Sequence, residues 1–213
     1  MSNEKKIERR NGVGSVMRAE GESRHVEGYA LVFNSLSNDL GGFREKISPV
    51  ALEGVIERSD IFALLNHDRS RGVLARCKMG KELSLRLSVD DKGLRYEFDA
   101  PHSALGDELL ECLSRGEIDS SSFAFTVLED QWERNGDEYL RTITKFDELF
   151  DVSPVYQPAY DETSCDLRGL ETLKAEERAA EERANAAKAE ADRIALGKYV
   201  ADLKNEINQI VKQ

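Results

Sequence analysis

The strongest constraint on the fold of this chain is an abrupt change of composition near residue 170. All four prolines and fourteen of the fifteen glycines lie before that point. The residues after it are dominated by Ala, Glu, Lys and Arg, which are strong helix formers. With 213 residues, 40% of them hydrophobic, the chain can build one ordinary domain. We therefore predict a flexible arm over residues 1–13, a folded domain over 14–168 and a helical tail over 169–213.

The predicted tail has two stretches of different character. Residues 177–190 carry almost no large apolar side chain, so this stretch can bury little surface. Beyond it, an apolar stripe with the spacing of one helix face contains Leu196, Tyr199, Leu203, Ile207 and Ile210. The stripe is equally consistent with a solvated helix and with a coiled coil, because sustained pairing needs about 3–4 heptads.

The folded domain shows the pattern of many short strands with only two helices. Residues 83–89 and 94–98 alternate between apolar and polar side chains around a turn, which predicts a hairpin. Ser103 and Gly116 flank a segment with apolar residues at helical spacing, which predicts a helix between them. About eight strands without βαβ alternation favour a mainly β (α+β) fold with a closed or sandwiched antiparallel sheet.

The charge balance disfavours several classes of partner. The chain has 30 basic and 41 acidic residues and a net charge of −11. Such a surface repels nucleic-acid backbones and anionic membranes. No apolar run approaches the roughly 18–20 residues of a membrane-spanning helix, and residues 1–10 lack the apolar stretch of a signal peptide. We therefore expect a soluble protein, made and used in a cytoplasm, with neither nucleic acid nor membrane as a partner.

The cysteines and histidines do not form a metal-binding pattern. Cys77, Cys112 and Cys165 lie far apart without a CxxC pair, as is typical of free thiols in a reducing compartment. The chain has only three histidines, and none has zinc-ligand spacing to a cysteine. We expect neither a metal ion nor another cofactor.

One histidine stands where a buried strand is expected to end. His67 follows the apolar run at residues 61–65 and precedes a charged turn that contains a glycine. Imidazole is the side chain best suited to proton transfer near neutral pH, and a strand end lets it reach solvent. An ordinary surface histidine would show the same pattern. His25 and His102 have no comparable surroundings, and we expect both at the surface.

A serine and an aspartate are the other candidates for chemistry. Ser122 ends a run of three serines and begins an apolar strand, in which the small Ala124 would leave room for a substrate backbone. Serines also gather in turns, and a serine nucleophile needs a neighbouring base. Asp151 interrupts an apolar strand, where a carboxylate must either face solvent or be paired. A histidine partner would satisfy Asp151 and would be oriented by it.

Several sequence blocks follow one another in a set order: VEGYALVFNSLS with GGFREKISPVAL, LLNHDRSRGVLAR, LSVDDKGLRYEFDAP, LLECLSRGEIDSSSFAF and LFDVSPVYQPAY. The order of these blocks resembles the prohead (capsid maturation) serine proteases of tailed bacteriophages. The blocks cover some 130 residues between Glu27 and Tyr160. The resemblance extends distantly to the herpesvirus assemblin proteases. It implies a small closed antiparallel β-barrel of the herpesvirus-protease type, ringed by helices.

The resemblance assigns a role to each candidate residue. The family's histidine falls on His67, its nucleophilic serine on Ser122 and its acidic residue on Asp151. The chain departs from the family pattern at three places: serines replace Gly-Met before the nucleophile, Ala124 replaces a glycine, and Asp replaces the more frequent Glu. An adjacent serine leaves the nucleophile open to a shift of one position. Backbone amides near Ser122 are candidate oxyanion donors, and Arg141 is a weaker one.

The resemblance also implies partners and a place of action. The substrate would be the scaffold, or scaffold-like segment, of the major capsid protein inside the immature capsid (the prohead) in the host cytoplasm. Self-cleavage is implied too. Because a helix without tertiary contacts opens easily, we expect self-cleavage to release the tail between Asp166 and Glu182. Until then the tail could pair with helical scaffold or with a second copy. The alternative is a non-catalytic capsid assembly or scaffold module that acts through the helical tail.

Overall fold

The structure is a computed structural model that describes residues 6–11, 17–19, 23–136, 138–156 and 168–210. The chain divides into two compact units, Met1–Asp166 and Leu167–Gln213. In the described residues the first unit contains all the strands, and the second consists of one helix. The predicted arm and domain boundaries at residues 13 and 168 stay predictions.

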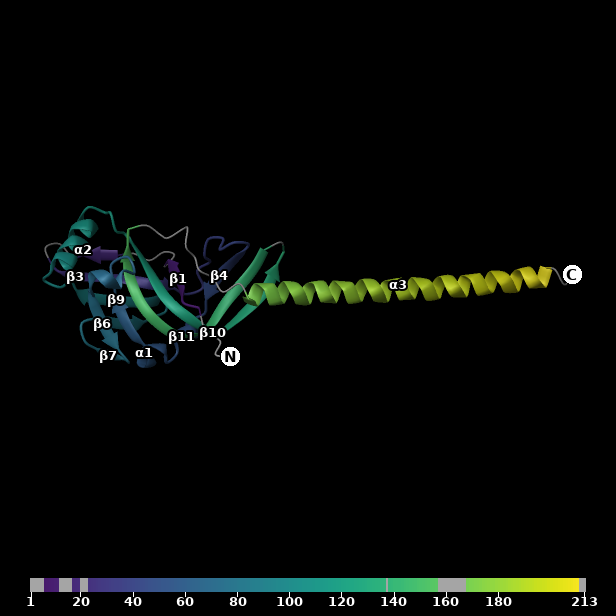
Figure 1. Ribbon diagram of the computed structural model, residues 1–213, viewed down its shortest axis with the longest axis horizontal. Coiled ribbons are helices and arrows are strands. Elements are labelled where there is room, and N and C mark those ends of the chain that lie inside the picture. Colours follow the sequence, from purple (N-terminus) through teal and green to yellow (C-terminus); the bar gives the residue numbers. More distant parts are fainter. Residues whose placement is uncertain (1–5, 12–16, 20–22, 137, 157–167, 211–213) are drawn as a thin grey trace. The chain divides into compact units, whose positions relative to one another are not determined.

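The first unit is built from two sheets and four short helical segments (Figure 1). In the seven-stranded sheet the order is β1 (Glu8–Asn11), β10 (Ser120–Asn135), β11 (Glu138–Val155), β5 (Asp60–Ala63), β6 (Ala75–Lys78) and β7 (Lys81–Glu82), with β4 (Phe43–Ile47) also on β11. In the four-stranded sheet the order is β2 (Met17–Ala19), β3 (His25–Val32), β9 (Gly93–Asp99) and β8 (Arg86–Val89). The helical segments are η1 (Pro49–Leu52), α1 (Val55–Arg58), η2 (Arg69–Arg71) and α2 (Ala104–Ser114).

The expectation of a closed antiparallel β-barrel is wrong. Within the described ranges neither sheet closes, because the end strands β1 and β7 of the larger sheet do not pair with each other. That sheet is also mixed, since β4 and β5 both run parallel to β11. One edge of β11 pairs with β4 at Tyr139–Ile143 and with β5 at Asp151–Val152. Alternation in the sequence indicates which faces are buried, but it does not say which strands pair.

The hairpin of β10 and β11 provides the two longest strands of the larger sheet (Figure 1). The sequence pattern predicts separate short strands at residues 122–128, 138–144 and 149–155, whereas the structure has two strands of 16 and 18 residues. Register shifts in the pairing occur between residues 124 and 130. Such bulges let a long strand bend without ending. Polar residues that interrupt the alternation in the sequence therefore lie inside one continuous strand. Gly136 at the hairpin tip has a φ of 67°, a left-handed conformation that suits glycine.

Aromatic packing explains why this hairpin is buried. Phe123 and Phe125 of β10 lie on one face and stack at 5.1 Å between ring centroids. Phe146 of β11 stacks on Phe125 at 4.6 Å. Burial of such rings is a large stabilising term in a core. The opposite face of β10 is buried as well, because Ser122 and Ala124 are each 2% exposed. The start of β10 is therefore a rigid place for a functional side chain.

The predicted helices are only partly as expected. Ser103 caps α2, because its side chain accepts a hydrogen bond from the Gly106 amide. Pro49 at a helix-opening position predicts a short helix over residues 49–57. In the structure this segment is split into η1 and α1 by Gly54, whose φ is 66°. Cys77 and Cys112 are free and buried, and Cys165 lies outside the described residues.

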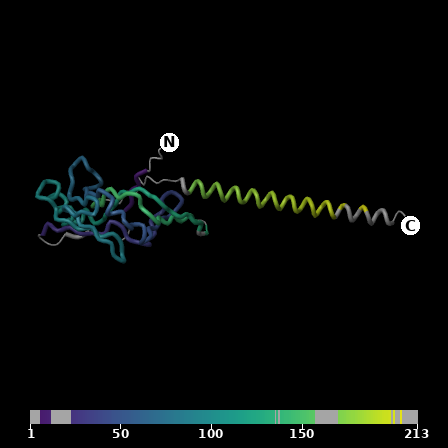
Figure 2. Tube along the Cα trace, turned by 90° about the horizontal axis from the view of Figure 1, so that it is seen from below, coloured from purple at the N-terminus to yellow at the C-terminus, as the bar shows by residue number. Residues whose placement is uncertain are grey.

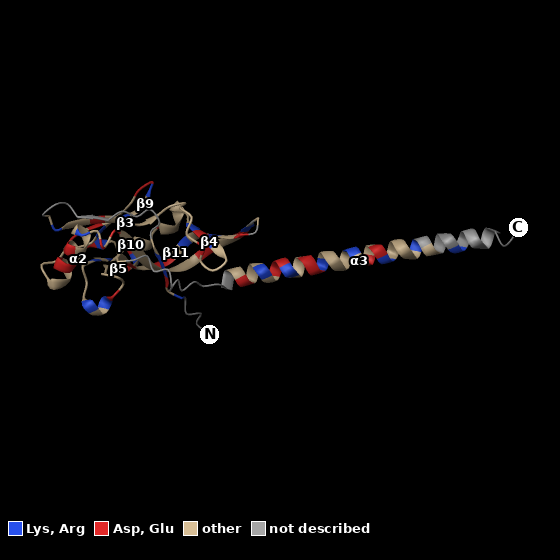
Figure 3. Ribbon diagram, turned by 90° about the horizontal axis from the view of Figure 1, so that it is seen from above, with Lys and Arg blue, Asp and Glu red and all other residues tan. Residues whose placement is uncertain are grey.

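The second unit is the helix α3 (Arg168–Ile210), which Figure 2 traces as one helix. Acidic and basic side chains alternate along its described length (Figure 3). Residues 181–198 are exposed throughout. The lack of large apolar side chains predicts this exposure for residues 181–190, and the apolar Ile194 and Leu196 are exposed as well. None of the described helices is long and apolar enough to cross a membrane.

Candidate active site

The structure brings together the three side chains singled out in the sequence. The Nδ1 atom of His67 lies 2.6 Å from Oδ1 of Asp151, and its Nε2 atom lies 2.6 Å from Oγ of Ser122. A carboxylate only accepts hydrogen bonds, so Nδ1 donates to Asp151 and Nε2 is left to accept from Ser122. The three side chains are 13%, 8% and 2% exposed, in the order His67, Asp151, Ser122.

Strand register places the serine and the aspartate. Ser122 on β10 lies opposite Ser153 on β11, and Asp151 lies two residues from Ser153 on the same strand. Residues two apart on a strand share a face, so Ser122 and Asp151 are diagonal neighbours on one face. Diagonal neighbours on paired strands lie roughly 7–8 Å apart. That spacing leaves room for an imidazole to bridge them.

The loop after β5 supplies the imidazole. β5 runs parallel to β11 with Phe62 opposite Asp151, so the chain leaves β5 close to the aspartate. The Asn66 amide then donates to the carbonyl oxygen of Pro154 at 2.9 Å, which ties the loop to β11. Asn66 and His67 both have positive φ, 55° and 60°. Non-glycine residues in this left-handed region are uncommon and cluster at functional sites.

Ser153 is a fourth member of the site that the sequence analysis did not identify. Its hydroxyl donates to Oδ1 of Asp151 at 2.6 Å, and its side chain is fully buried. Asp151 therefore accepts from two donors, which hold the carboxylate toward His67. The only signal for Ser153 in the sequence is that it lies two residues after Asp151 on a predicted strand, which places both side chains on one face. A serine at this distance from an aspartate is too common to indicate a functional role.

The adjacent serines have different environments. Ser121 points away from the His67 side of β10 and lies 2.7 Å from the hydroxyl of the fully buried Tyr96. Burial raises the pKa of Tyr96 above its usual value. Ser120 donates instead to the carboxylate of Asp119 at 2.6 Å. Of the three serines, Ser122 is the one in contact with the histidine.

The N-terminal strand β1 lies directly beside Ser122. β1 pairs antiparallel with β10, so that Asn11 faces Ser122 and Arg9 faces Ala124. The main-chain oxygen of Arg10 lies 2.9 Å from the hydroxyl oxygen of Ser122 and is a second acceptor for its single proton. The small Ala124 was expected to leave room for a substrate backbone. In the structure the residue that lies opposite Ala124 is Arg9 of β1, which belongs to the same chain.

A buried charge cluster lies under β1, and Arg141 is at its centre. Arg141 donates to Glu8 at 2.7 and 3.1 Å, to Glu45 at 3.0 Å and to Asp130 at 2.7 Å. Its guanidinium also lies 5.6 Å from the ring centroid of Trp132. Because Nε, Nη1 and Nη2 of Arg141 all donate hydrogen bonds to carboxylates, Arg141 is poorly placed to donate to an oxyanion.

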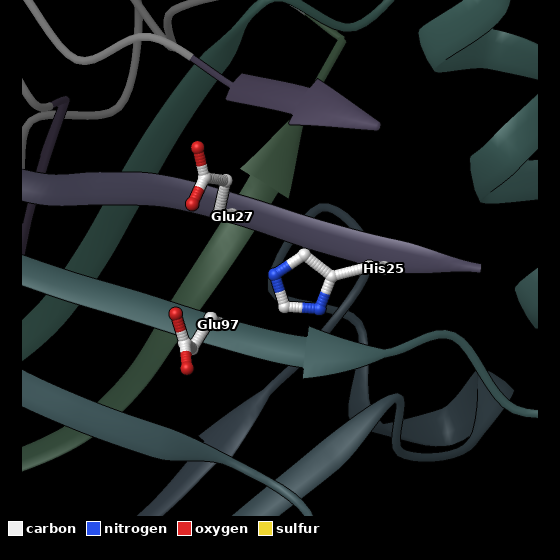
Figure 4. Close-up of side chains that lie close together, drawn as sticks. All are labelled: His25, Glu27 and Glu97. Atoms are coloured by element: carbon white, nitrogen blue, oxygen red, sulfur yellow. The ribbon is translucent and has the colours of Figure 1, made fainter. Parts of the chain in front are cut away.

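A second group of polar side chains lies on the smaller sheet, away from Ser122. The ligand atoms of His25, Glu27 and Glu97 lie within 4.8 Å of one another (Figure 4). Both carboxylates already have cationic partners, since Arg95 pairs with Glu27 and with Glu97. These ion pairs account for the cluster without a metal ion. His102 is exposed, as expected, whereas His25 is only 23% exposed.

A serine, a histidine and an aspartate in one hydrogen-bonded chain can carry out acyl transfer. Among comparisons with known proteins, the model of one family, described as caudovirus prohead serine protease, matches residues 14–177. His67, Ser122 and Asp151 all lie inside the matched range. Searches of curated proteins and of solved structures found no match.

Proposed function

This chain belongs to the caudovirus prohead serine protease family, and we propose that Ser122, His67 and Asp151 are its catalytic residues. Membership implies a serine protease that acts in capsid maturation, in contact with capsid proteins and inside the capsid in the host cytoplasm. The observation that carries the assignment is the pair of 2.6 Å contacts that join Asp151 to His67 and His67 to Ser122.

Each residue has one role in the proposed reaction. The Oγ atom of Ser122 attacks the carbonyl carbon of the scissile bond while Nε2 of His67 takes the hydroxyl proton. His67 then gives that proton to the leaving amine, and water hydrolyses the acyl-enzyme by the same route in reverse. Asp151 stabilises the imidazolium and fixes the tautomer in which Nε2 is the acceptor.

The proposed substrate is the scaffold, or scaffold-like segment, of the major capsid protein, together with the protease itself. The second unit supports a role in docking, because α3 continues as a helix beyond the charged stretch into the predicted apolar stripe. Ile194, Leu196 and Val200 of this region are exposed. We propose that α3 pairs with helical scaffold, or with a second copy of the chain, until self-cleavage releases it.

Labelling with a fluorophosphonate probe and co-expression with the cognate capsid protein test the proposal together. Wild-type protein is expected to take up the probe and to shorten the capsid protein, and Ser122→Ala is expected to do neither. Ser121→Ala is the matched control, because it removes the neighbouring hydroxyl and leaves the contacts of His67 intact. Loss of both readouts in Ser121→Ala alone would move the nucleophile by one residue. No labelling and no cleavage by any version would favour a non-catalytic assembly module.

A further inference from the structure

β1 occupies the sheet edge at which the nucleophile lies. It pairs with the outer edge of β10 over four residues, with Arg10 opposite Phe123 and Asn11 opposite Ser122. Addition of an extended segment to a sheet edge is a general way of holding a peptide, since main-chain hydrogen bonds give affinity and side-chain pockets give specificity. A segment of this chain is therefore already held in an extended form beside Ser122.

The peptide bond between Arg10 and Asn11 lies next to the hydroxyl of the proposed nucleophile. Oγ of Ser122 lies 2.9 Å from the carbonyl oxygen of Arg10, and the carbonyl carbon is about 1.23 Å from that oxygen. The hydroxyl has one proton and two neighbouring acceptors, the Arg10 oxygen and Nε2 of His67. When the proton turns to His67, the lone pairs of Oγ are free to approach the carbonyl carbon.

We propose that β1 is the first substrate of this protease and that Ser122 cuts the bond between Arg10 and Asn11. The proposal rests on the proposed role of Ser122 as nucleophile. Oγ bonds to the Arg10 carbonyl carbon as His67 takes the hydroxyl proton, the C–N bond breaks, and His67 protonates the Asn11 nitrogen. Water then gives a proton to His67 and attacks the ester, which releases residues 1–10 with a free carboxylate and restores the Ser122 hydroxyl.

Recognition of the residue before the cut falls to Glu45. The guanidinium of Arg10 donates to Glu45 through Nε at 2.9 Å and through Nη2 at 3.0 Å, the two-pronged geometry that distinguishes arginine. Arg10 is 5% exposed and Glu45 is 3% exposed. The guanidinium also lies 5.7 Å from the ring centroid of Phe125. Arg141 also donates to Glu45 at 3.0 Å, so the carboxylate keeps one cation without Arg10 but loses both of the Arg10 hydrogen bonds. A buried acceptor that loses its donors is costly, so Glu45 favours a side chain that can donate to both of its oxygens.

Arg141 binds the side chain of a second substrate position, two residues before the arginine. Glu8, two residues before Arg10 on the same face of β1, accepts from both Nη atoms of Arg141 and is 1% exposed. Next to the scissile bond a pocket opens that is lined by Arg10, Asn11, Glu45 and Phe123, among others. The contacts define a substrate of the form Glu-x-Arg, held extended and cut after the arginine.

The same pattern recurs in the tail. Glu-x-Arg occurs four times in the chain, beginning at Glu8, Glu22, Glu176 and Glu181. The last two end in Arg178 and Arg183, which are exposed on α3. The bond after Arg178 lies inside the window already expected for release of the tail. Cleavage there requires α3 to unwind locally around Arg178. The side chains of residues 180–198 are exposed, and a helical stretch without tertiary packing is marginal in water.

Intact-mass measurement and N-terminal sequencing of the full chain test the proposal. Wild-type protein is expected to begin at Asn11, and Ser122→Ala is expected to keep residues 1–10. Arg10→Ala is expected to slow the loss of residues 1–10 by at least about 100-fold, since a pocket built for hydrogen bonds rejects a residue that cannot make them. The matched control is Arg9→Ala, because the Arg9 side chain on the same strand is exposed and its loss should leave trimming unchanged.

A measurement on separate peptides covers the case in which Arg10→Ala disturbs the fold. Wild-type protein is expected to cut a synthetic peptide of residues 4–15 after Arg10, and to cut the Arg10→Gln peptide at least about 100-fold more slowly. Protein that takes up the probe and cuts capsid protein, yet keeps Met1–Arg10 and ignores the arginine, would overturn this inference and leave the proposed function standing. Protein that neither labels nor cuts anything would overturn both.

Discussion

Asp151 accepts hydrogen bonds from both His67 and Ser153, so its replacement tests the site at the scale of a single residue. In Asp151→Asn the side-chain amide can donate to Nδ1 of His67, which would put the imidazole proton on Nε2 and remove the acceptor for Ser122. We expect cleavage of capsid protein to slow by about 10⁴-fold, as for the corresponding change in other Ser-His-Asp enzymes. The thermal midpoint of the variant controls for folding. Activity within tenfold of wild type would remove Asp151 from the mechanism.

In the proposed reaction, Ser153 acts only through its hydrogen bond to Asp151. A hydrogen bond to a charged group contributes about 1.5–3 kcal/mol, and a factor of ten in rate corresponds to about 1.4 kcal/mol. We therefore expect Ser153→Ala to slow probe labelling of Ser122 by about 10–100-fold. The control is Ser120→Ala, which removes a serine hydroxyl from the same region but leaves the contacts of the Asp151 carboxylate intact. Equal labelling rates in the two variants would show that His67 alone positions Asp151.

The local patterns made His67, Ser122 and Asp151 candidates but left an ordinary structural explanation open for each. The resemblance in the order of the blocks then singled them out. Their catalytic roles remain proposals. Ser153 and Arg10 could not be found in the same way, since their importance depends on register. Ser153 matters because it lies opposite Ser122, and Arg10 matters because β1 folds back from 112 residues away to contact Ser122. No local pattern in the sequence carries that information.

At the scale of secondary-structure elements, Arg141 joins four strands. It lies on β11 and pairs with Glu8 of β1, Glu45 of β4 and Asp130 of β10. Removing one partner from a buried ion cluster typically costs about 3–5 kcal/mol, because the opposite charge stays buried. We expect Arg141→Ala to lower the free energy of unfolding by that amount.

Urea denaturation in the Ser122→Ala background measures this loss while β1 stays attached. Arg44→Ala is the control, because Arg44 is 45% exposed and lies 3.7 Å from Glu138, and exposed pairs contribute about 0–1 kcal/mol. Equal midpoints for the two variants would mean that the cluster contributes little to stability.

Elements with strong local signals were predicted, and so was the pairing of β8 with β9 across their short turn. Pairing between strands that are distant in the sequence was not predicted. The serine cap identified α2, and the alternation over residues 94–98 lies within β9. The closed barrel was wrong because β11 is long enough to pair with two parallel strands along one edge. The bulges near Ala124 joined segments that look separate in the sequence.

At the scale of the whole molecule, the two units should differ in the free energy of local opening. The described side chains of α3 beyond residue 180 are exposed, and a helix without tertiary packing is marginal in water. Hydrogen exchange monitored by mass spectrometry on Ser122→Ala protein is expected to show exchange at residues 181–198 within seconds. Peptides from the start of β10 should exchange only through rare opening of the core. Strong protection of residues 181–198 would contradict this prediction and would indicate pairing of α3 with a partner.

Trp132 is the single tryptophan of the chain, and its position makes the protein its own fluorescent reporter. The indole lies 4.9 Å from the Phe43 ring and donates to Asp130 at 3.2 Å, beside the guanidinium of Arg141. Loss of Glu8 with β1 would change the charge around that guanidinium and hence the local field at the indole. Tryptophan fluorescence, excited selectively, should therefore change in emission wavelength or intensity when the N-terminal strand is released. Maturation could then be timed in an unlabelled sample.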